Sequence, residues 1–477
     1  MGLRARRVEL TRAAGTTLLV LLAALVLDVL FEGWVQQIFG HAGPRDAKGQ
    51  LTWVLAGWPK TVKSALFLAV LAVTLAKVAL DRSWRDFATK TEAALVALAM
   101  VMVAAGLFGG CGPVLIGQSL FVYFRGVIVF FAWRALRPTC RQLKPIVIAV
   151  GVIAVLNASV AMAEFAFGLP VFRALGWTEL TWARLARADG FFNHPNHLGH
   201  FLMVVDLGLL CWFMTLERVS RKWWLLFGFL AFGLSATQSR ESTIGFVLGA
   251  AVMWWFRRGS VKPVVIAAVL VLGFAGLQVA IPKNQATVAD RLAGVFNAIG
   301  GGKPKPSGKD DPAASRQETR IVFFKQGAGL LVRRPLLGYG VGQFGGTVAY
   351  QHDPYWYDTL VDNKLDPAHP DFPLAGAHPD QVDSFWLHLT VETGLLGLAF
   401  YLLWLYFLIS PIVRARQRDS LLRSWAPALI AASVVIAVLS PALEDQLYPV
   451  LLFTVLGWAW AAPGAGSPLP AALPRSR

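Results

Sequence analysis

Long apolar runs separated by short polar segments recur along most of the chain. About twelve of these runs are close to the roughly 20 residues that an α-helix needs to cross a bilayer. They lie at 14–34, 61–80, 91–110, 113–133, 145–167, 197–216, 222–238, 242–257, 262–281, 385–410, 424–443 and 446–462. Because backbone groups in lipid must pair within their own segment, the pattern predicts an all-α polytopic membrane protein.

One long polar interruption, at 282–384, divides the predicted spans into two groups. Residues 288–299 could form a short helix, 300–312 are rich in Gly, Pro and Lys and read as flexible, and 315–332 mix apolar and polar positions in a way that favours the membrane interface. The predicted organisation is a nine-span bundle at 1–281, a large extracytoplasmic loop with short helices at 282–384, three further spans at 385–462 and a cytoplasmic tail at 463–477.

The distribution of charge predicts how the chain is oriented. The chain is 56% hydrophobic and only 15% charged, with a formal net charge of +16. The Lys and Arg residues gather in alternate loops, which the positive-inside rule places in the cytoplasm together with both termini. Their position between apolar runs argues against nucleic-acid binding. Asp28 and Glu32 come where a signal-peptide cleavage site would need small residues, so the first run is interpreted as a retained span.

Two arginines flank the predicted outer mouth of the sixth and seventh spans. Arg187 precedes the sixth span, and Arg240 follows the polar end of the seventh. Guanidinium groups bind phosphate oxygens in a bidentate fork and stay charged at any working pH, so the pair would suit a lipid-linked diphosphate. The alternative is that both side chains are interfacial anchors that snorkel to the membrane surface.

A third arginine, Arg125, lies near the middle of the fourth predicted span. A charge at that depth costs at least roughly 2.5–3.5 kcal/mol, so it should face the bundle interior and have a partner. Either it lines the substrate cavity or it forms a structural ion pair.

The segment after Arg187 concentrates imidazole and amide groups. His194, His197 and His200 do not come with enough Cys or acidic residues to complete a closed metal shell, so no metal is expected. The pattern favours helix capping and substrate hydrogen bonding by Asn193, His194 and Asn196. The three cysteines form no CxxC pair.

Asp383 stands at the start of the tenth predicted span. The helix dipole alone explains a carboxylate there, but the same group could act as a general base for a sugar hydroxyl. His378 and His388 are alternative bases, because neutral imidazole suits that chemistry near pH 7.

Four segments in a set order lead to a family. They are Arg187-x-x-Gly190-Phe-Phe-x-x-Pro-Asn196-x-Leu-Gly, Ser239-Arg240, Pro335-Leu-Leu-Gly338-Tyr-Gly340-Val-Gly342, and Asp383-Ser-Phe-Trp-Leu followed by Glu392-Thr-Gly-Leu-Leu-Gly397. Together they resemble the signatures of the bacterial O-antigen ligase and O-antigen polymerase superfamily.

This resemblance implies a glycosyltransferase of the inner membrane, similar to the GT-C-type membrane enzymes, with its active site facing the periplasm. Such enzymes transfer a glycan from an undecaprenyl-diphosphate-linked oligosaccharide to an acceptor sugar hydroxyl, without a cofactor. Arg187 and Arg240 would hold the diphosphate, with Arg125 as a further candidate, and Gly340 would help to position substrate. The implied partners are the donor, a saccharide acceptor, the lipid bilayer, a polysaccharide flippase and a chain-length regulator.

One departure from the family pattern bears on the reaction. Ligases usually carry His-Asn where this chain has Asp383-Ser384, which favours a polysaccharide polymerase over a ligase that transfers to lipid A core. His378 is then a substitute base. The alternative from another class is a secondary transporter for an anion, but the chain shows no inverted repeat and its outer loop is unusually large for that class.

Overall fold

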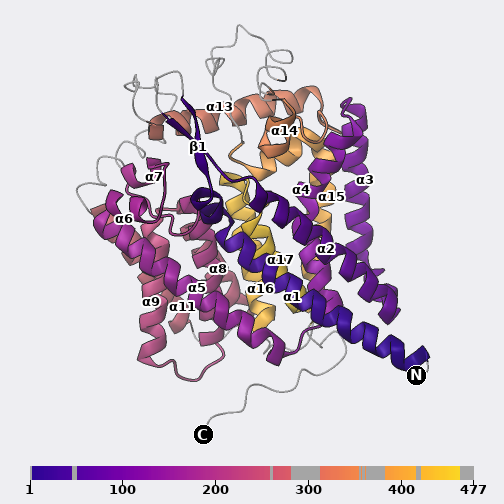
Figure 1. Ribbon diagram of the computed structural model, residues 1–477, viewed down its shortest axis with the longest axis horizontal. Coiled ribbons are helices and arrows are strands. Elements are labelled where there is room, and N and C mark those ends of the chain that lie inside the picture. Colours follow the sequence, from indigo (N-terminus) through magenta and orange to yellow (C-terminus); the bar gives the residue numbers. More distant parts are fainter. Residues whose placement is uncertain are drawn as a thin grey trace.

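The structure is a computed structural model that describes residues 3–45, 51–257, 261–280, 312–353, 356, 360, 382–414 and 421–461. It is a bundle of long helices with smaller elements gathered at one end (Figure 1). The elements are α1 (Leu3–Ile38), β1 (His41–Arg45), β2 (Leu51–Val54), α2 (Trp58–Asp81), η1 (Trp84–Phe87), α3 (Lys90–Phe108), α4 (Pro113–Leu136), α5 (Cys140–Phe167), α6 (Leu169–Ala174), α7 (Thr181–Arg184), α8 (Pro195–Phe213), α9 (Arg221–Ala236), α10 (Arg240–Arg257), α11 (Lys262–Ala280), α13 (Pro312–Arg333), α14 (Gly346–His352), α15 (Phe385–Arg414), α16 (Leu421–Leu439) and α17 (Leu447–Ala461).

The helices agree with the pattern of apolar runs. A helix overlaps each of the twelve predicted spans. Within the described residues, α1, α2, α3, α4, α5, α8 and α15 contain stretches long and apolar enough to cross a membrane, and shorter apolar stretches lie in α11, α16 and α17. The all-α membrane class is therefore confirmed, while a total of twelve crossings stays a prediction.

Small residues let neighbouring helices approach closely, as is usual for helices in lipid. Between α4 and α17, a Cβ at Gly457 would lie 2.6 Å from the Cβ of Trp133. A Cβ at Gly126, on α4, would collide with the ring of Phe453. Trp133 also donates from Nε1 to the Thr454 hydroxyl over 3.0 Å, so packing and a hydrogen bond define the register of this pair.

The tenth predicted span, 385–410, is not one continuous helix. α15 breaks at Gly394, which takes φ 66° and ψ −170°. The Pro335 carbonyl accepts from the Leu395 amide over 2.8 Å, and the Glu392 carbonyl accepts from the Gly340 amide over 2.9 Å. A side chain at position 394 would collide with this docked segment. Two motifs that lie far apart in sequence, at 335–342 and 392–397, are thus joined backbone to backbone.

A small cap covers one end of the bundle, called the cap end below. α13 lies across that end and α14 sits beside it (Figure 1). Phe323, Phe344, Trp356 and Val382 belong to the cap's own apolar cluster. Residues 315–332, predicted to lie at the interface, fall within α13. Pro312, the last residue of the stretch predicted to be flexible (300–312), is the first residue of α13. The rest of that stretch, the predicted helix at 288–299 and the tail at 463–477 lie outside the described residues.

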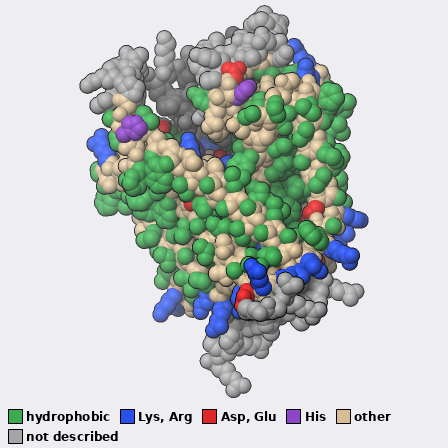
Figure 2. Space-filling view, turned by 45° about the vertical axis from the view of Figure 1, so that its right-hand side comes forward, with side chains coloured by type: hydrophobic (Ala, Val, Ile, Leu, Met, Phe, Trp, Pro, Cys, Tyr) green, Lys and Arg blue, Asp and Glu red, His purple; other side chains and the backbone are tan. Residues whose placement is uncertain are grey.

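Lys and Arg side chains gather at the end of the bundle opposite the cap (Figure 2). The same view shows a hollow near the cap end, with basic and acidic side chains visible inside it. This distribution is the one that the positive-inside rule requires if the cap end faces outward.

One buried carboxyl group, that of Asp206 on α8, makes no hydrogen bond to any described residue through either of its oxygens. Because an unpaired buried polar group costs about 1–3 kcal/mol, Asp206→Val is expected to raise the thermal midpoint of the purified protein. Leu207→Ala, at the next and equally buried position, should lower it. A large loss of stability in Asp206→Val would contradict this account.

Candidate functional site

The N-termini of four helices meet at the cap end. A Cβ at Gly199, on α8, would lie 2.7 Å from the Ser242 hydroxyl on α10. His197 of α8 lies 3.1 Å from Asp445, just before α17, and the first amide of α15 donates to the turn that precedes α17 over 3.2 Å. Each helix N-terminus carries a partial positive charge, so the convergence of α8, α10, α15 and α17 favours an anionic ligand.

Arg187 lies against the connection between α9 and α10. Its Nε donates to the Thr237 carbonyl over 2.9 Å, and its Nη2 donates to Asn196 Oδ1 over 2.6 Å. The guanidinium carbon lies 5.3 Å from the centre of the Trp182 ring. The half-buried guanidinium is thus aimed by groups from three different segments, which a snorkelling anchor would not need.

Arg240 is the first residue of α10 and is exposed. The segment before it is bound to the segment before Arg187, because Gln238 Nε2 donates to the Ala186 carbonyl over 2.9 Å. Ala186 and Gln238 have φ values of 54° and 51°, a conformation that costs non-glycine residues about 1–2 kcal/mol each. The structure therefore brings the two predicted arginine segments together, and both carry backbone strain of the kind that gathers at functional sites.

The residues predicted to position substrate have partners of their own. His194 caps α8 by accepting the Asn196 amide at Nδ1 over 3.0 Å. Asn193 is exposed and lies 3.0 Å from His197 Nδ1. Asn196 accepts the Arg187 hydrogen bond. Capping and support of Arg187 thus account for His194 and Asn196, while their contact with substrate stays a prediction.

Asp383 is half-buried and comes two residues before α15. His378, the substitute base, lies outside the described residues. Gly340 has a φ of 106°, and a Cβ there would lie 2.7 Å from Cys111 Sγ. Packing against the turn between α3 and α4 is therefore a sufficient reason for this glycine, and its role toward substrate stays a prediction.

A buried cluster around His388 joins α15 to the turn before α17. His388 Nδ1 lies 2.6 Å from Glu444 Oε1, and Nε2 lies 2.9 Å from Glu392 Oε1. Both ring nitrogens face carboxylates and the imidazole is buried, so neither nitrogen is open to a substrate hydroxyl. This geometry favours Asp383 over His388 as the base.

Glu392 connects the same cluster to the glycine-rich segment. Its Oε1 accepts the backbone amides of Gln343 and Phe344 over 2.9 and 3.1 Å, and its Oε2 accepts the Tyr123 hydroxyl over 3.0 Å. The side chain is fully buried. Glu392 thus fastens the segment 338–346 to the first part of α15, just before the break at Gly394.

Three consecutive residues of the turn between α16 and α17 bind three separate helices. Glu444 contacts His388 on α15, Asp445 contacts His197 on α8, and Gln446 accepts from Lys63 on α2. Lys63 also pairs with Glu32 of α1 over 2.7 Å, and both side chains are buried. These residues will be called the acidic turn (444–446).

Arg125 lies among the same groups. It is buried on α4, within electrostatic reach of Asp445, Glu444 and Glu32. Although burial alone would raise the pKa of Asp445, His197, with His200 and Arg125, lowers it below its ordinary value. The acidic neighbours are what the ion-pair alternative requires of Arg125, and its contact with a diphosphate stays a prediction.

The acidic turn was not singled out from the sequence, although one signal for it exists. Glu444 and Asp445 are all that separates two predicted spans, so two acidic groups occupy a very tight connection in a strongly basic chain. Lys63 and Tyr123 carry no comparable signal, because a lysine near a helix start and a tyrosine within an apolar helix are both common in membrane proteins.

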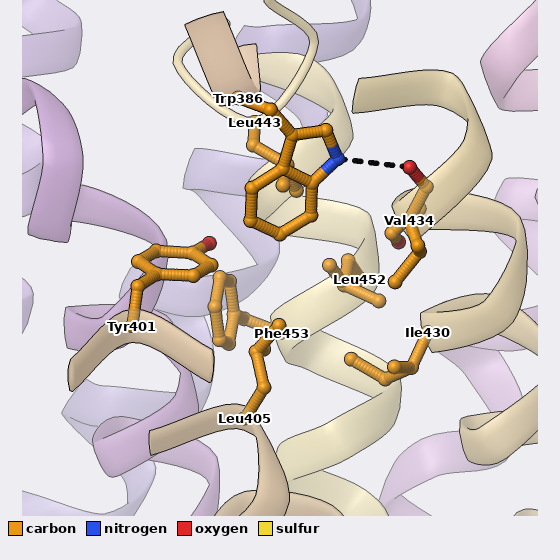
Figure 3. A pocket seen from close by; sticks show the side chains of 9 residues that line it. Trp386, Tyr401, Leu405, Ile430, Val434, Leu443, Leu452 and Phe453 are labelled. Carbon is orange, nitrogen blue, oxygen red and sulfur yellow. Dashed lines mark hydrogen bonds between the residues drawn. The ribbon is translucent and has the colours of Figure 1, made fainter. Parts of the chain in front are cut away.

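A second feature near this site is an apolar pocket between α15, α16 and α17 (Figure 3). Trp386 closes one side, with its Nε1 bonded to the Val434 carbonyl over 3.0 Å, and Tyr401, Leu443 and Phe453 line the rest. The lining is apolar, and the cavity of about 10 Å³ has room for no more than a water molecule.

The fold and the site together define a multi-pass helical membrane protein with a polar, anion-favouring mouth at one end of its bundle. A family model described as O-antigen ligase matches residues 225–402, from α9 into α15. This match over part of the chain supports the resemblance to the O-antigen ligase and O-antigen polymerase superfamily that the motifs indicate. The matched stretch contains Arg240, the glycine-rich segment, Asp383 and Glu392. No curated protein matches the chain.

The family supports a bacterial membrane glycosyltransferase of the ligase or polymerase type, acting on a lipid-linked oligosaccharide donor and an acceptor. The prediction of a membrane glycosyltransferase of the ligase or polymerase type is therefore supported by the family match.

Proposed function

We propose that this protein is a polysaccharide polymerase that transfers a glycan from an undecaprenyl-diphosphate donor to the sugar hydroxyl of a second lipid-linked unit, on the outer side of the inner membrane. The observation that carries the proposal is the joining of the Arg187 and Arg240 segments where four helix N-termini converge. That arrangement offers positive charge from two guanidinium groups and from the backbone to one diphosphate.

The reaction follows from these positions. The diphosphate docks on Arg187 and Arg240, which stabilise the negative charge that develops as the bond between the anomeric carbon and the phosphate oxygen breaks. Asp383 takes the proton of the acceptor hydroxyl, and the acceptor oxygen attacks the anomeric carbon with inversion. Undecaprenyl diphosphate leaves with the bonding electrons, and no metal or cofactor takes part.

One feature supports the finer part of the proposal. An aspartate at position 383, in place of the histidine usual in ligases, favours the polymerase over the ligase. Ligation to lipid A core is the second candidate, because the matching family is described by that activity.

The test is transfer by the purified protein in detergent with undecaprenyl-diphosphate-linked glycan and EDTA, with products resolved by chain length. A ladder of lengthened lipid-linked glycan is the expected result. Transfer only after addition of a separate lipid A core acceptor would establish the ligase instead. No transfer in either case, together with uptake of an anion by proteoliposomes, would overturn both in favour of a transporter.

Asp383→Asn keeps the size of the side chain and removes the base. It is expected to lower kcat by at least about 100-fold, because general-base catalysis contributes on that order. The thermal midpoint should not change, and donor binding should survive because both arginines remain. An Asp383→Asn variant with normal turnover would exclude Asp383 as the base.

A further inference from the structure

The loop that carries Arg187 is held from behind by a carboxyl group of α5. This Arg187 loop (residues 185–194) connects α7 to α8. Glu164 Oε2 accepts the backbone amides of Asp189 and Gly190 over 3.0 and 2.9 Å. Glu164 is 3% exposed, and it comes just before the end of α5. Two hydrogen bonds from backbone amides to one buried carboxyl group are a strong local restraint, because hydrogen bonds to charged groups are stronger than those between neutral groups.

Neighbouring contacts define the same loop conformation. Asn157, about two helical turns before Glu164 on α5, accepts a hydrogen bond from the Phe191 amide at Oδ1 over 3.1 Å. The Gly190 carbonyl accepts from Trp177 Nε1 over 3.3 Å. Gly190 has a φ of 62°, and a Cβ there would lie 2.7 Å from the Asn157 oxygen, so the close approach needs glycine. Three residues in a row of this loop are therefore pinned to α5.

The Glu164 carboxyl group lies close to the Arg187 guanidinium. Glu164 and Arg187 line the same cleft, between the end of α5 and α7. On the other side of the loop, the Ala188 amide donates to the Ala236 carbonyl over 3.0 Å. The loop is thus held between α5 and the end of α9, and Arg187 is presented from it toward Thr237 and Asn196.

We propose that Glu164 is a positioning residue, which holds the Arg187 loop in the conformation that receives the anionic donor, and that it does so while sharing one proton with Asp189. The inference rests on the proposed function, since it gives Glu164 its role through Arg187. Sharing a proton leaves the two carboxyl groups with a single negative charge, which keeps them compatible with a diphosphate bound nearby.

The buried carboxyl pair makes this restraint dependent on pH. Burial, and then the neighbouring Glu164, raise the pKa of Asp189 well above its ordinary value, and Glu179 adds to the effect. Arg187 lines the same cleft as Glu164. Because the folded protein binds this proton more tightly than the unfolded chain, the restraint is strongest while the pair holds its single shared proton and weakens as pH rises through the folded-state pKa of Asp189.

The test compares Glu164→Ala, Glu164→Gln and the matched control Glu179→Ala. Glu179 is exposed and is also near Asp189, so its loss removes a charge without removing an acceptor for the loop. Amide hydrogen exchange in detergent reports loop order as the protection of residues 187–192. Glycan transfer, measured as kcat/KM for the donor across a range of pH, reports function.

Glu164→Ala is expected to lower the protection of the loop amides and kcat/KM at least about 10-fold each, while the control leaves both unchanged. Glu164→Gln keeps an oxygen for the two loop amides and supplies an amide N–H donor to Asp189 at any pH. It should therefore keep the loop protection of the wild type and remove the loss of kcat/KM that is expected of the wild type at high pH.

Unchanged loop protection in Glu164→Ala would overturn the inference, and so would a Glu164→Gln variant with the pH profile of the wild type. The pH profile of Glu164→Gln tests the inference even if Glu164→Ala fails to fold. A wild-type chain that transfers no glycan would contradict the proposed function, whereas the exchange measurement would still decide whether Glu164 positions the loop.

Discussion

Replacing either Arg187 or Arg240 with alanine is expected to lower glycan transfer by at least about 100-fold, the usual effect of removing one donor that stabilises developing charge. Arg187→Ala loses the half-buried guanidinium bonded to Thr237 and Asn196. Arg240→Ala loses an exposed one and should leave stability unchanged. Initial rates with a saturating acceptor, together with the thermal midpoint of each variant, check this expectation.

Two further variants separate a phosphate-binding role from general loss of positive charge. Arg184, in α7, is exposed and precedes Arg187 by three residues, so Arg184→Ala is expected to keep full activity. Arg187→Lys keeps the charge but loses the fork that bonds two partners, and should recover only part of the rate. Full activity in both Arg187→Ala and Arg240→Ala would refute the diphosphate assignment.

The second large effect is expected on stability. Lys63→Met leaves the Glu32 carboxylate buried without its partner, which should lower the free energy of unfolding by about 3–5 kcal/mol. The loss reaches beyond this pair, because Lys63 also binds Gln446 of the acidic turn. Unfolding in detergent by SDS titration or heat would measure it.

A double variant and an exposed pair serve as controls. Combining Lys63→Met with Glu32→Gln removes both charges and should recover most of the lost stability, since the cost comes from the unpaired charge. Arg137→Met removes one partner of the exposed Arg137–Asp86 pair and should cost no more than about 1 kcal/mol. Equal losses in Lys63→Met and the double variant would show that the ion pair is not the cause.

Much of the helical framework could be predicted from the sequence because apolar runs of bilayer length have few alternative structures. The break at Gly394 could not, because its cause is the docking of the segment at 335–340, more than fifty residues earlier in the chain. The spacing of apolar residues indicates which face of a helix contacts lipid or the protein interior. It carries no information about a distant segment whose backbone hydrogen-bonds to the helix.

The site shows the same division. Arg187 and Arg240 were found because charged residues at the ends of apolar runs stand out, and the structure joins their segments. Glu164, His388 and the acidic turn acquire their partners only through contacts between distant helices. Each consists of one to three polar residues in an apolar setting. Residue type alone does not tell which of these residues will meet at one end of the bundle.

The acidic turn also constrains how the chain can change in length. Glu444, Asp445 and Gln446 bind helices α15, α8 and α2 from adjacent positions, and no spare residue separates one contact from the next. Inserting or deleting one residue there would shift all three side chains to the wrong partners at once. Length variation among related chains should therefore spare this turn, so the turn's length can serve as an anchor for aligning distant relatives.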